Sequence, residues 1–319
     1  MSMRIAFVGK GGSGKTTMSA LFSLYMDSRH HKTVGLVDVD VNSHTAEVLG
    51  VATQDIQYLS ATDVQTDIMT YLAGSNQLVD ASEILNTTPP GKGSGRYSPK
   101  RDNYITSSYA NIFGQRSSIL TLGSYSGASI GADCHHTTQH VAENILTHAQ
   151  LADDEILVVD SVAGNDTFAN SLYLQDVLLF IVRPERESMS VYHRYYQLAV
   201  DAGVSDRVYA IGNNALTDMQ RAFIEKHIPA DRLLGIVSTS DIIIERRLED
   251  LPLDVSCIDT SLESLFDSVY DKTRQHQRTP AEYYHEITTL HQKVASQSWV
   301  AGAYRKGLVD QIDPEYEAL

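Results

Sequence analysis

A glycine-rich segment near the N-terminus has the residue types of a phosphate-binding loop. Residues 9–17 read GKGGSGKTT, which matches the pattern G-x-x-x-x-G-K-[ST] between an apolar stretch and a segment of helical periodicity. Glycines let the backbone turn tightly, so that successive N–H groups and the helix N-terminus point at negative charge. In this pattern the Lys15 ammonium reaches the β and γ oxygens, the Thr16 hydroxyl coordinates Mg²⁺, and Thr17 can bond the α-phosphate. The segment therefore predicts a nucleotide site made of Gly11, Gly12, Ser13, Gly14, Lys15, Thr16 and Thr17.

Two apolar stretches end in aspartate, a residue type that suits a metal ion beside phosphates. Residues 37–42 read VDVDVN, and residues 156–164 read ILVVDSVAG. Ligands of open α/β sheets bind at the carboxyl ends of the strands, which is where both stretches deliver their acids. Alternation along an extended strand places Asp38 and Asp40 on the same face. The plainer alternative is that these acids solvate a strand end or, for Asp160, cap the following turn.

A second lysine, Lys10, turns the loop into K-G-G-x-G-K-T-T. With it the chain resembles the deviant Walker A ATPases, the class that includes MinD, ParA and the nitrogenase iron protein. In that class the extra lysine crosses a dimer interface and contacts the nucleotide phosphates of the partner. The resemblance therefore implies a homodimer closed by ATP and Mg²⁺, with Lys10, Lys15 and Asp40 as catalytic residues and Asp40 positioning or activating the attacking water. A solvated loop charge is the alternative reading of Lys10.

The same resemblance implies roles for residues on either side of the second acidic strand. It implies that Asp38 supports the magnesium shell, that Asp160 holds a magnesium-bound water, and that the Gly164 N–H senses the γ-phosphate. Asn213 follows an apolar stretch and lies where members of the class read adenine with an asparagine. Residues 237–241, VSTSD, depart from the proline and aspartate often found in the later loop, which leaves a second adenine contact open.

A segment rich in histidine precedes the strand that ends in Asp160. Residues 131–140 read GADCHHTTQH, and in the related nickel-insertion ATPases that mature carbon monoxide dehydrogenase a C-x-C pair in this part of the chain binds metal between two subunits. Here Cys134 takes the first position and His136 the second. Two copies would supply two thiolates and two imidazoles at a dimer interface, a ligand set that suits tetrahedral Zn²⁺ and also nickel. A local site of His136 with His140 on one helix face, or a polar helix start with one thiol, are the alternatives.

The elements that would position these residues alternate along the chain. Short apolar stretches rich in β-branched residues are separated by longer segments of helical periodicity, the pattern of βαβ units. We therefore predict an α/β fold with a mostly parallel central sheet of about seven or eight strands flanked by helices, which the resemblance makes a P-loop NTPase of the deviant Walker A class. The helix expected from Gly14 carries an apolar face of Met18, Leu21, Phe22 and Tyr25. The expected strands cover residues 4–8, 33–37, 118–122, 155–159, 177–182, 207–211 and 233–237.

Two parts of the chain break this rhythm. Residues 86–116 include TTPPGKGSGRYSPKRDNY, which is poor in aliphatic side chains and rich in turn residues, so a flexible insertion is expected there. The C-terminal residues contain long helix-compatible stretches such as AEYYHEITTLHQKVASQ. We accordingly predict a P-loop ATPase domain over residues 1–260 with the insertion at about 86–116, and a C-terminal helical extension over residues 261–319 packed on or beside it.

Composition argues against several classes of partner. The chain has 319 residues and a formal charge of −15, from 40 acidic and 25 basic side chains, which would repel a nucleic-acid backbone. No apolar run is long enough to span a bilayer, and the N-terminus lacks a signal-peptide pattern. The two cysteines do not make a disulfide framework. We therefore expect a cytoplasmic protein with no nucleic-acid partner and no membrane span.

The leading hypothesis from these features is a dimeric molecular switch that hydrolyses ATP slowly and acts as a metal chaperone, assisting metal insertion or the maturation of a client protein. Two other classes share the same nucleotide motifs. A positioning or partner-regulating ATPase like ParA or MinD would need no metal. An ATP-dependent small-molecule ligase of the same fold would need a substrate pocket beside the γ-phosphate.

Overall fold

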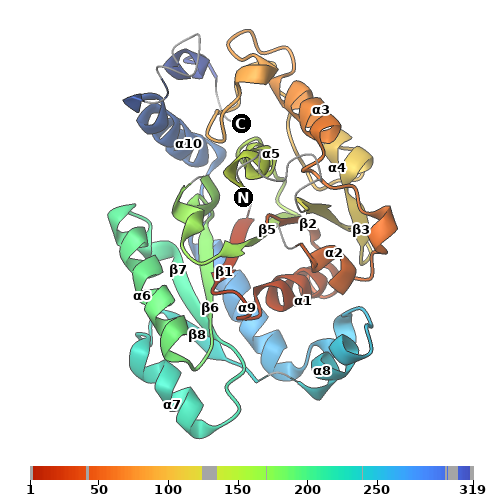
Figure 1. The fold of residues 1–319 in the computed structure, drawn as a ribbon, viewed down its shortest axis with the longest axis vertical. Coiled ribbons are helices and arrows are strands. Elements are labelled where there is room, and N and C mark those ends of the chain that lie inside the picture. Colours follow the sequence, from red (N-terminus) through yellow and green to blue (C-terminus); the bar gives the residue numbers. More distant parts are fainter. Residues whose placement is uncertain are drawn as a thin grey trace.

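The computed structural model of the chain contains one central sheet with helices on both of its faces (Figure 1). It describes residues 3–40, 43–123, 135–169, 171–238, 240–298, 300 and 308–316. The strands within these residues are β1 (Met3–Gly9), β2 (Thr33–Asp38), β3 (Asn111–Phe113), β4 (Ser117–Thr121), β5 (Glu155–Ala163), β6 (Val177–Val182), β7 (Val208–Gly212) and β8 (Leu233–Ile236). Their spatial order is β3-β4-β2-β5-β1-β6-β7-β8, and every neighbouring pair is parallel except β3 with β4.

The prediction of a mostly parallel sheet of seven or eight strands is confirmed. Each apolar stretch taken as a strand forms one, and β3 adds a short antiparallel strand at the edge. In β1 the side chains alternate between the two faces, so that Ala6 and Val8 belong to one apolar core and Ile5 and Phe7 to the other. The central strands are apolar on both sides because helices cover both sides.

The helices form a layer on each face of the sheet. The layer that packs on Ile5 and Phe7 consists of α1 (Lys15–Ser28), α8 (Asp241–Leu248) and α9 (Thr260–Gln275). The opposite layer consists of α3 (Thr62–Ala73), α5 (His135–Thr147), α6 (Arg186–Asp201) and α7 (Asp218–His227). The remaining α-helices are α2 (Thr45–Val48), α4 (Tyr104–Tyr109) and α10 (Pro280–Ala295). In the part of the chain that the structure describes, no helix is both long enough and apolar enough to cross a membrane.

The helix α9 completes the core on the α1 side of the sheet. Phe22 of α1 meets Phe266 of α9 edge-on, with 5.5 Å between the ring centroids, and Tyr25 lies 5.6 Å from the same ring. Phe22 and Tyr25 belong to the apolar face of α1 that the sequence predicts, and both are buried. The boundary proposed at residue 260 therefore falls at the start of a helix that is part of the core of the α/β domain.

The segment expected to be a flexible insertion, residues 86–116, is attached along its length. Tyr97 is fully buried, its N–H donates to the carbonyl of His148 (3.1 Å), and its own carbonyl accepts from the N–H of Gln150 (2.9 Å). Further on, β3 pairs with β4. Backbone hydrogen bonds and one large aromatic ring supply here the packing that aliphatic runs supply elsewhere, which contrasts with the loose loop that the composition indicates.

The helix α10 is held to the sheet by charged side chains. Arg278, just before the helix, donates from Nε to Oδ1 of Asp176 (2.8 Å), and both side chains are buried. Glu286 of α10 accepts from Arg278 and also from Nη1 of Arg207 (2.9 Å). These contacts place α10 beside the amino-terminal ends of the central strands, near α5 (Figure 1).

Candidate functional site

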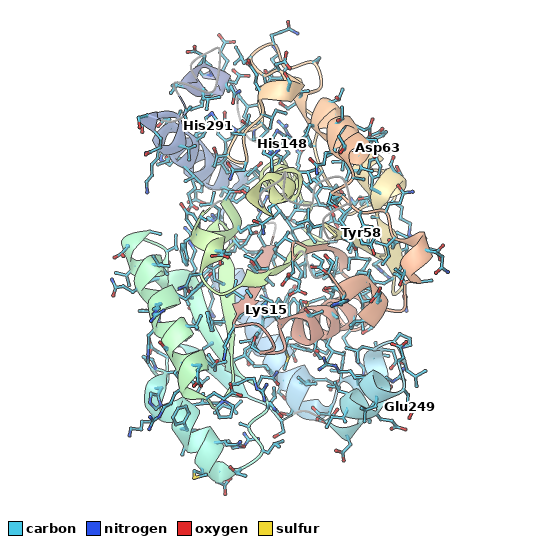
Figure 2. All side chains as sticks on the ribbon, viewed as in Figure 1. Lys15, Tyr58, Asp63, His148, Glu249 and His291 are labelled. Atoms are coloured by element: carbon cyan, nitrogen blue, oxygen red, sulfur yellow. The ribbon has the colours of Figure 1, made fainter. Side chains whose placement is uncertain are left out.

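The glycine-rich segment forms a tight loop between β1 and α1. The N–H of Ser13 donates to the carbonyl of Lys10 (3.1 Å), and Gly14 takes φ of 100° at the N-cap of α1. Lys15 is the first residue of α1, where Figure 2 labels it, and only 7% of its side chain surface is exposed. Gly11 and Gly12 are exposed. The loop therefore has the open backbone and the enclosed lysine that the sequence predicts for a phosphate site.

Close packing leaves no room for side chains at two of the loop glycines. A Cβ on Gly14 would lie 2.3 Å from Nδ2 of Asn213, and a Cβ on Gly9 would lie 2.6 Å from the carbonyl oxygen of Ile181. By contrast, a Cβ on Gly12 would meet nothing within 4 Å. The loop is thus packed against β6 and β7 on its inner side and open on its outer side, a shape that fits a nucleotide phosphate chain.

The two strand-end aspartates lie side by side on neighbouring strands. Asp38 and Asp160 are register partners in β2 and β5, and each is 1% exposed. Thr45 at the start of α2 joins them, because its N–H donates to Oδ2 of Asp38 (3.3 Å) and its hydroxyl donates to Oδ2 of Asp160 (2.9 Å). Oδ1 of Asp160 is buried without a hydrogen-bond partner in the described structure.

Burial and mutual repulsion disfavour the charged forms of these carboxyl groups. Burial, and then the charge of Asp160, raise the pKa of Asp38. The pKa of Asp160 is also raised, because the effect of burial outweighs a hydrogen bond from Thr16 and the charge of Lys15, which both lower it. A divalent cation would remove the repulsion between the two carboxylates and could be coordinated by the unpaired Oδ1 of Asp160. The oxygen ligands of Thr16, Asp38 and Asp160 therefore fit Mg²⁺.

Asp40 lies two residues beyond the end of β2, so its place on the same face as Asp38 stays a prediction. Its N–H donates to Oδ1 of Asp38 (3.2 Å), and its carbonyl accepts from the hydroxyl of Ser43. Its charge is nevertheless close enough to add to the effect of burial in raising the pKa of Asp160. Asp40 therefore lies near the other two acids although it is outside β2.

Gly164 follows β5 with φ of 78° and is partly exposed. Its N–H, which the resemblance assigns to sensing the γ-phosphate, donates to the carbonyl of Gly9 (3.0 Å). The hydrogen bond ties the end of β5 to the first residue of the phosphate loop. A contact from this N–H to a phosphate would have to replace it.

A cavity of about 560 Å³, counting its open mouth, adjoins the loop on the side of β6 and β7. Asn213 lies in it and donates from Nδ2 to the carbonyl of Ser13 (2.8 Å). The size and position suit a nucleoside. The residues that line it are Gly12, Ser13, Gly14, Thr17, Met18, Arg183, Asn213, Asn214, Ser238, Ile243, Arg247 and Leu262.

Three residues of this region were missed from the sequence. Thr45 carries no motif of its own, and its signal is only a threonine at a helix start shortly after the paired acids. Arg183 follows the end of β6, a position that the rule of ligands at strand ends would have singled out. Arg247 comes from α8 and has no sequence signal that would place it beside the loop.

The predicted transition-metal ligands are not tested by the structure. Cys134 lies outside the described residues, as does the side chain of His136, although His136 falls within α5. His140, the partner in the alternative local site, bonds through Nε2 to the carbonyl of Ile84 (2.6 Å). Among the residues that are described, no group of three or more His, Cys, Asp and Glu side chains could hold a metal ion.

Comparison with known proteins identifies a matching family and several relatives. A family model described as the CobQ/CobB/MinD/ParA nucleotide binding domain matches residues 5–253. The carbon monoxide dehydrogenase accessory protein CooC of Rhodospirillum rubrum is 22% identical over 238 residues, which cover 74% of this chain and 83% of that protein. An uncharacterized ATP-binding protein of Methanocaldococcus jannaschii is 23% identical over 260 residues, covering 79% of this chain and 91% of the relative.

Two solved structures illustrate the likeness of the fold. A plasmid partition protein from Borrelia burgdorferi bound to AMPPNP aligns with a TM-score of 0.56 at 13% identity, over 87% of this chain and 100% of the other. The cell division ATPase MinD of Pyrococcus furiosus aligns with a TM-score of 0.52 at 17% identity, over 85% of this chain and 99% of the other. At these identities the likeness establishes the fold alone.

Proposed function

The chain belongs to the family of CobQ/CobB/MinD/ParA nucleotide-binding domains, and from that membership we propose that it is a Mg²⁺-dependent ATP hydrolase working as a conformational switch. The observation that carries this proposal is the contact of Thr45 with both Asp38 and Asp160 beside the phosphate loop. It joins the start of α2 to both buried carboxylates, and Thr16 and Lys15 of the loop interact with one of them, Asp160. A change at the γ-phosphate is therefore transmitted to α2 through short contacts.

Each group of the site has a defined task in this proposal. Lys15 neutralises the β- and γ-phosphates from its enclosed position, and Thr16, Asp38 and Asp160 hold the magnesium shell. Mg²⁺, when bound, neutralises charge that develops on the phosphate oxygens. Asp40, two residues after β2, orients the water that attacks the γ-phosphate. Asn213, fixed by Ser13, faces the base in the neighbouring cavity.

The switch is proposed to act as a homodimer that forms with ATP. Lys10 is partly exposed and lies next to the exposed Gly11 and Gly12, which supports a role for its ammonium in contacting a second subunit. The motif K-G-G-x-G-K-T-T, which the chain shares with the deviant Walker A class, supports the same conclusion. Contacts made only with ATP present would couple closure of the dimer to the nucleotide state.

Nucleotide binding and turnover are separated by two variants. Lys15→Ala should abolish ATP binding in calorimetry, whereas Asp40→Asn should bind ATP and lose phosphate release. The partly exposed Lys32 and the exposed Asp55 supply matched controls, Lys32→Ala and Asp55→Asn, which should behave as wild type. Turnover retained by Asp40→Asn would reject the role given to Asp40, and ATP binding by Lys15→Ala would reject the site itself.

We further propose that the switch serves metal delivery to a client enzyme. The support is the similarity to an accessory protein of carbon monoxide dehydrogenase, together with the C-x-H sequence of Cys134 and His136. Two copies of this pair supply four ligands suited to Zn²⁺ or Ni²⁺.

Metal stoichiometry by mass spectrometry tests the delivery role. About one metal ion per dimer is expected for wild type, and none for Cys134→Ser. The buried Cys257 provides the control, because Cys257→Ser removes a thiol without touching the proposed site and should keep the metal. Equal metal content in wild type and Cys134→Ser would contradict the role.

A partner-regulating ATPase without metal is the second candidate, and the fold similarity to MinD and to a plasmid partition protein favours it. It shares the whole nucleotide site with the first candidate. The metal measurement separates the two, since a metal-free protein that still dimerises with ATP would fit only the second.

A further inference from the structure

A second cavity, of about 470 Å³ with its open mouth, lies at the edge of the sheet opposite the phosphate loop. Arg4 at the start of β1 lines it, whereas the loop follows the other end of the same strand, so about 20 Å of extended chain separates them. Figure 2 shows His148, another lining residue, well apart from Lys15. The lining residues are Arg4, Pro90, Arg96, Thr147, His148, Ala149, Gln150, Leu151, Pro280, Tyr283, Tyr284, Ile287 and Tyr316.

Positive charge lines this cavity, as it lines the nucleotide cavity, within an acidic molecule. Two arginines and no aspartate or glutamate occur among the lining residues of the described chain, although the whole protein carries a charge of −15. Asp176, which accepts from the backbone N–H of Arg4, is shared with the buried Arg278. The local balance therefore favours an anionic ligand.

Aromatic rings and backbone carbonyls contact both guanidinium groups. Arg4 is 3% exposed, lies 4.0 Å from the ring centroid of Tyr283 and donates to the carbonyl of Ala149 (3.0 Å). Arg96 lies 5.1 Å from the ring centroid of Tyr316, and its hydrogen bonds go to backbone carbonyls such as that of Gly95 (3.1 Å). A planar, pre-oriented guanidinium suits a planar anion, since the two can form parallel hydrogen bonds.

The remaining walls of the cavity are flat and apolar. The rings of Tyr284 and Tyr316 lie 4.9 Å apart at their centroids, and Ile287 and Leu151 add aliphatic surface. Aromatic walls of this kind bind a flat organic body by stacking and by edge contacts. Inorganic anions would leave this surface in contact with water.

His148 adds a neutral polar group to the cavity. Burial, reinforced by the charge of Arg96, lowers the pKa of His148 to about 3, so the ring is uncharged near neutral pH. Its Nδ1 donates to the carbonyl of Asn144 (3.0 Å), which makes Nε2 the acceptor nitrogen. A ligand with a hydroxyl or an amine on its ring can use that acceptor.

A carboxylate fits these groups better than a phosphate. The glycine-rich residues 91–95 lie next to Arg96, but their amides are already engaged: Ser94 donates to the carbonyl of Gly91 (3.1 Å) and Gly95 donates to that of Leu72 (3.0 Å). The loop thus offers no set of free N–H groups of the kind that cradles phosphate.

We propose that this cavity is a second ligand site, which binds a small aromatic carboxylate with its ring among the tyrosines and its carboxylate at Arg96 and Arg4. The site is separate from the proposed ATPase activity. The helix α10 and Tyr316, which build much of it, follow the last residue of the family match at 253, so the site belongs to what this chain adds to the family domain.

Calorimetry on the full chain saturated with Mg-ADP tests the proposal without using ATP turnover. The probes are benzoate and 4-hydroxyphenylacetate, with benzamide and 4-hydroxyphenylacetamide as neutral counterparts and with acetate, inorganic phosphate and AMP as other anions. At least one aromatic carboxylate should bind saturably, and its amide should bind about tenfold more weakly or worse. The proposal is overturned if neither carboxylate binds, if the amides bind equally well, or if phosphate or AMP binds more tightly.

Two variants locate the binding. Arg96→Gln removes the guanidinium and should weaken the carboxylate about tenfold or more, whereas Arg101→Gln, an exposed arginine of the same segment, should leave its affinity within about twofold. Gln150→Trp fills the mouth from an exposed position without removing an internal contact, so it should block binding even if Arg96→Gln folds poorly. Wild-type affinity in both Arg96→Gln and Gln150→Trp would place the ligand elsewhere.

Discussion

The hydroxyl of Thr45 donates a 2.9 Å hydrogen bond to Oδ2 of Asp160, across 115 residues of chain. The N–H of the same residue donates to Asp38, so one residue at the start of α2 bridges both buried carboxylates. In the proposed mechanism, movement of either carboxylate toward a magnesium ion would alter the position of α2. This bridge is the structural basis for treating the site as a switch.

Removing the Thr45 hydroxyl should uncouple the bridge while keeping the nucleotide loop. Thr45→Val is isosteric, and the loss of a hydrogen bond to a charged group should lower the rate of ATP hydrolysis about tenfold or more. Thr53→Val removes an exposed hydroxyl that bonds to Glu47 nearby in the sequence and should leave the rate unchanged. Phosphate-release assays compare the two, and an unaltered rate in Thr45→Val would show that the bridge has no part in turnover.

The packing of Gly14 against Asn213 predicts a different kind of defect. Gly14→Ala combines an unfavourable positive φ with a Cβ 2.3 Å from Nδ2 of Asn213, so the loop must shift and ATP binding should be lost. Gly203→Ala has a similar φ of 72° but meets nothing within 4 Å. It should cost about 1 kcal/mol of stability from strain alone and bind ATP normally. Thermal unfolding measures the stability of each variant. A separate calorimetric titration of the folded variant with ATP then distinguishes the effect of strain from that of the clash.

The ion pairs of α10 predict a dependence of stability on pH. Burial alone would raise the pKa of Glu286, but hydrogen bonds and charges from Arg207 and Arg278 lower it below its ordinary value of 4.5. A depressed carboxyl pKa stabilises the folded state above the unfolded value, and this stabilisation is lost as the pH falls through the folded value. Near neutral pH, Glu286→Gln should therefore cost about 2 kcal/mol by leaving two arginines without their shared partner.

Denaturant unfolding at several pH values measures this effect. The difference between wild type and Glu286→Gln should begin to shrink near pH 4.5, where the carboxyl of the unfolded chain becomes protonated. It should vanish at the lower pH at which the folded carboxyl is also protonated. Glu263→Gln removes the partner of the exposed Arg29 and should change stability by less than about 1 kcal/mol. A gap that stays constant with pH would mean that α10 is held by packing and not by charge.

Local patterns in the sequence predicted most of the sheet and the phosphate loop. Strands buried on both faces, such as β1 and β6, appear as continuous apolar stretches whatever surrounds them, so they can be recognised one at a time. The loop is recognisable for a similar reason, since its glycines are dictated by backbone geometry close to the strand that precedes it.

Contacts between segments far apart in the sequence could not be predicted from local patterns. The bridge from Thr45 and the approach of Arg247 depend on where α2 and α8 pack, which no local pattern encodes. Asp40 was placed by strand alternation, but β2 ends two residues before it, and its N–H donates to Oδ1 of Asp38. The segment around Tyr97 was predicted to be a flexible loop from its average composition, but the single buried ring of Tyr97 anchors it.

The most direct test of the central claim is the molar mass from light scattering with and without a non-hydrolysable ATP analogue and Mg²⁺. Wild type and the exposed-lysine control Lys92→Ala should change from monomer to dimer when the analogue is added, and Lys10→Ala should bind it and stay monomeric. If Lys10→Ala dimerises as wild type does, or if wild type shows no change in mass, the account of an ATP-closed dimeric switch is contradicted.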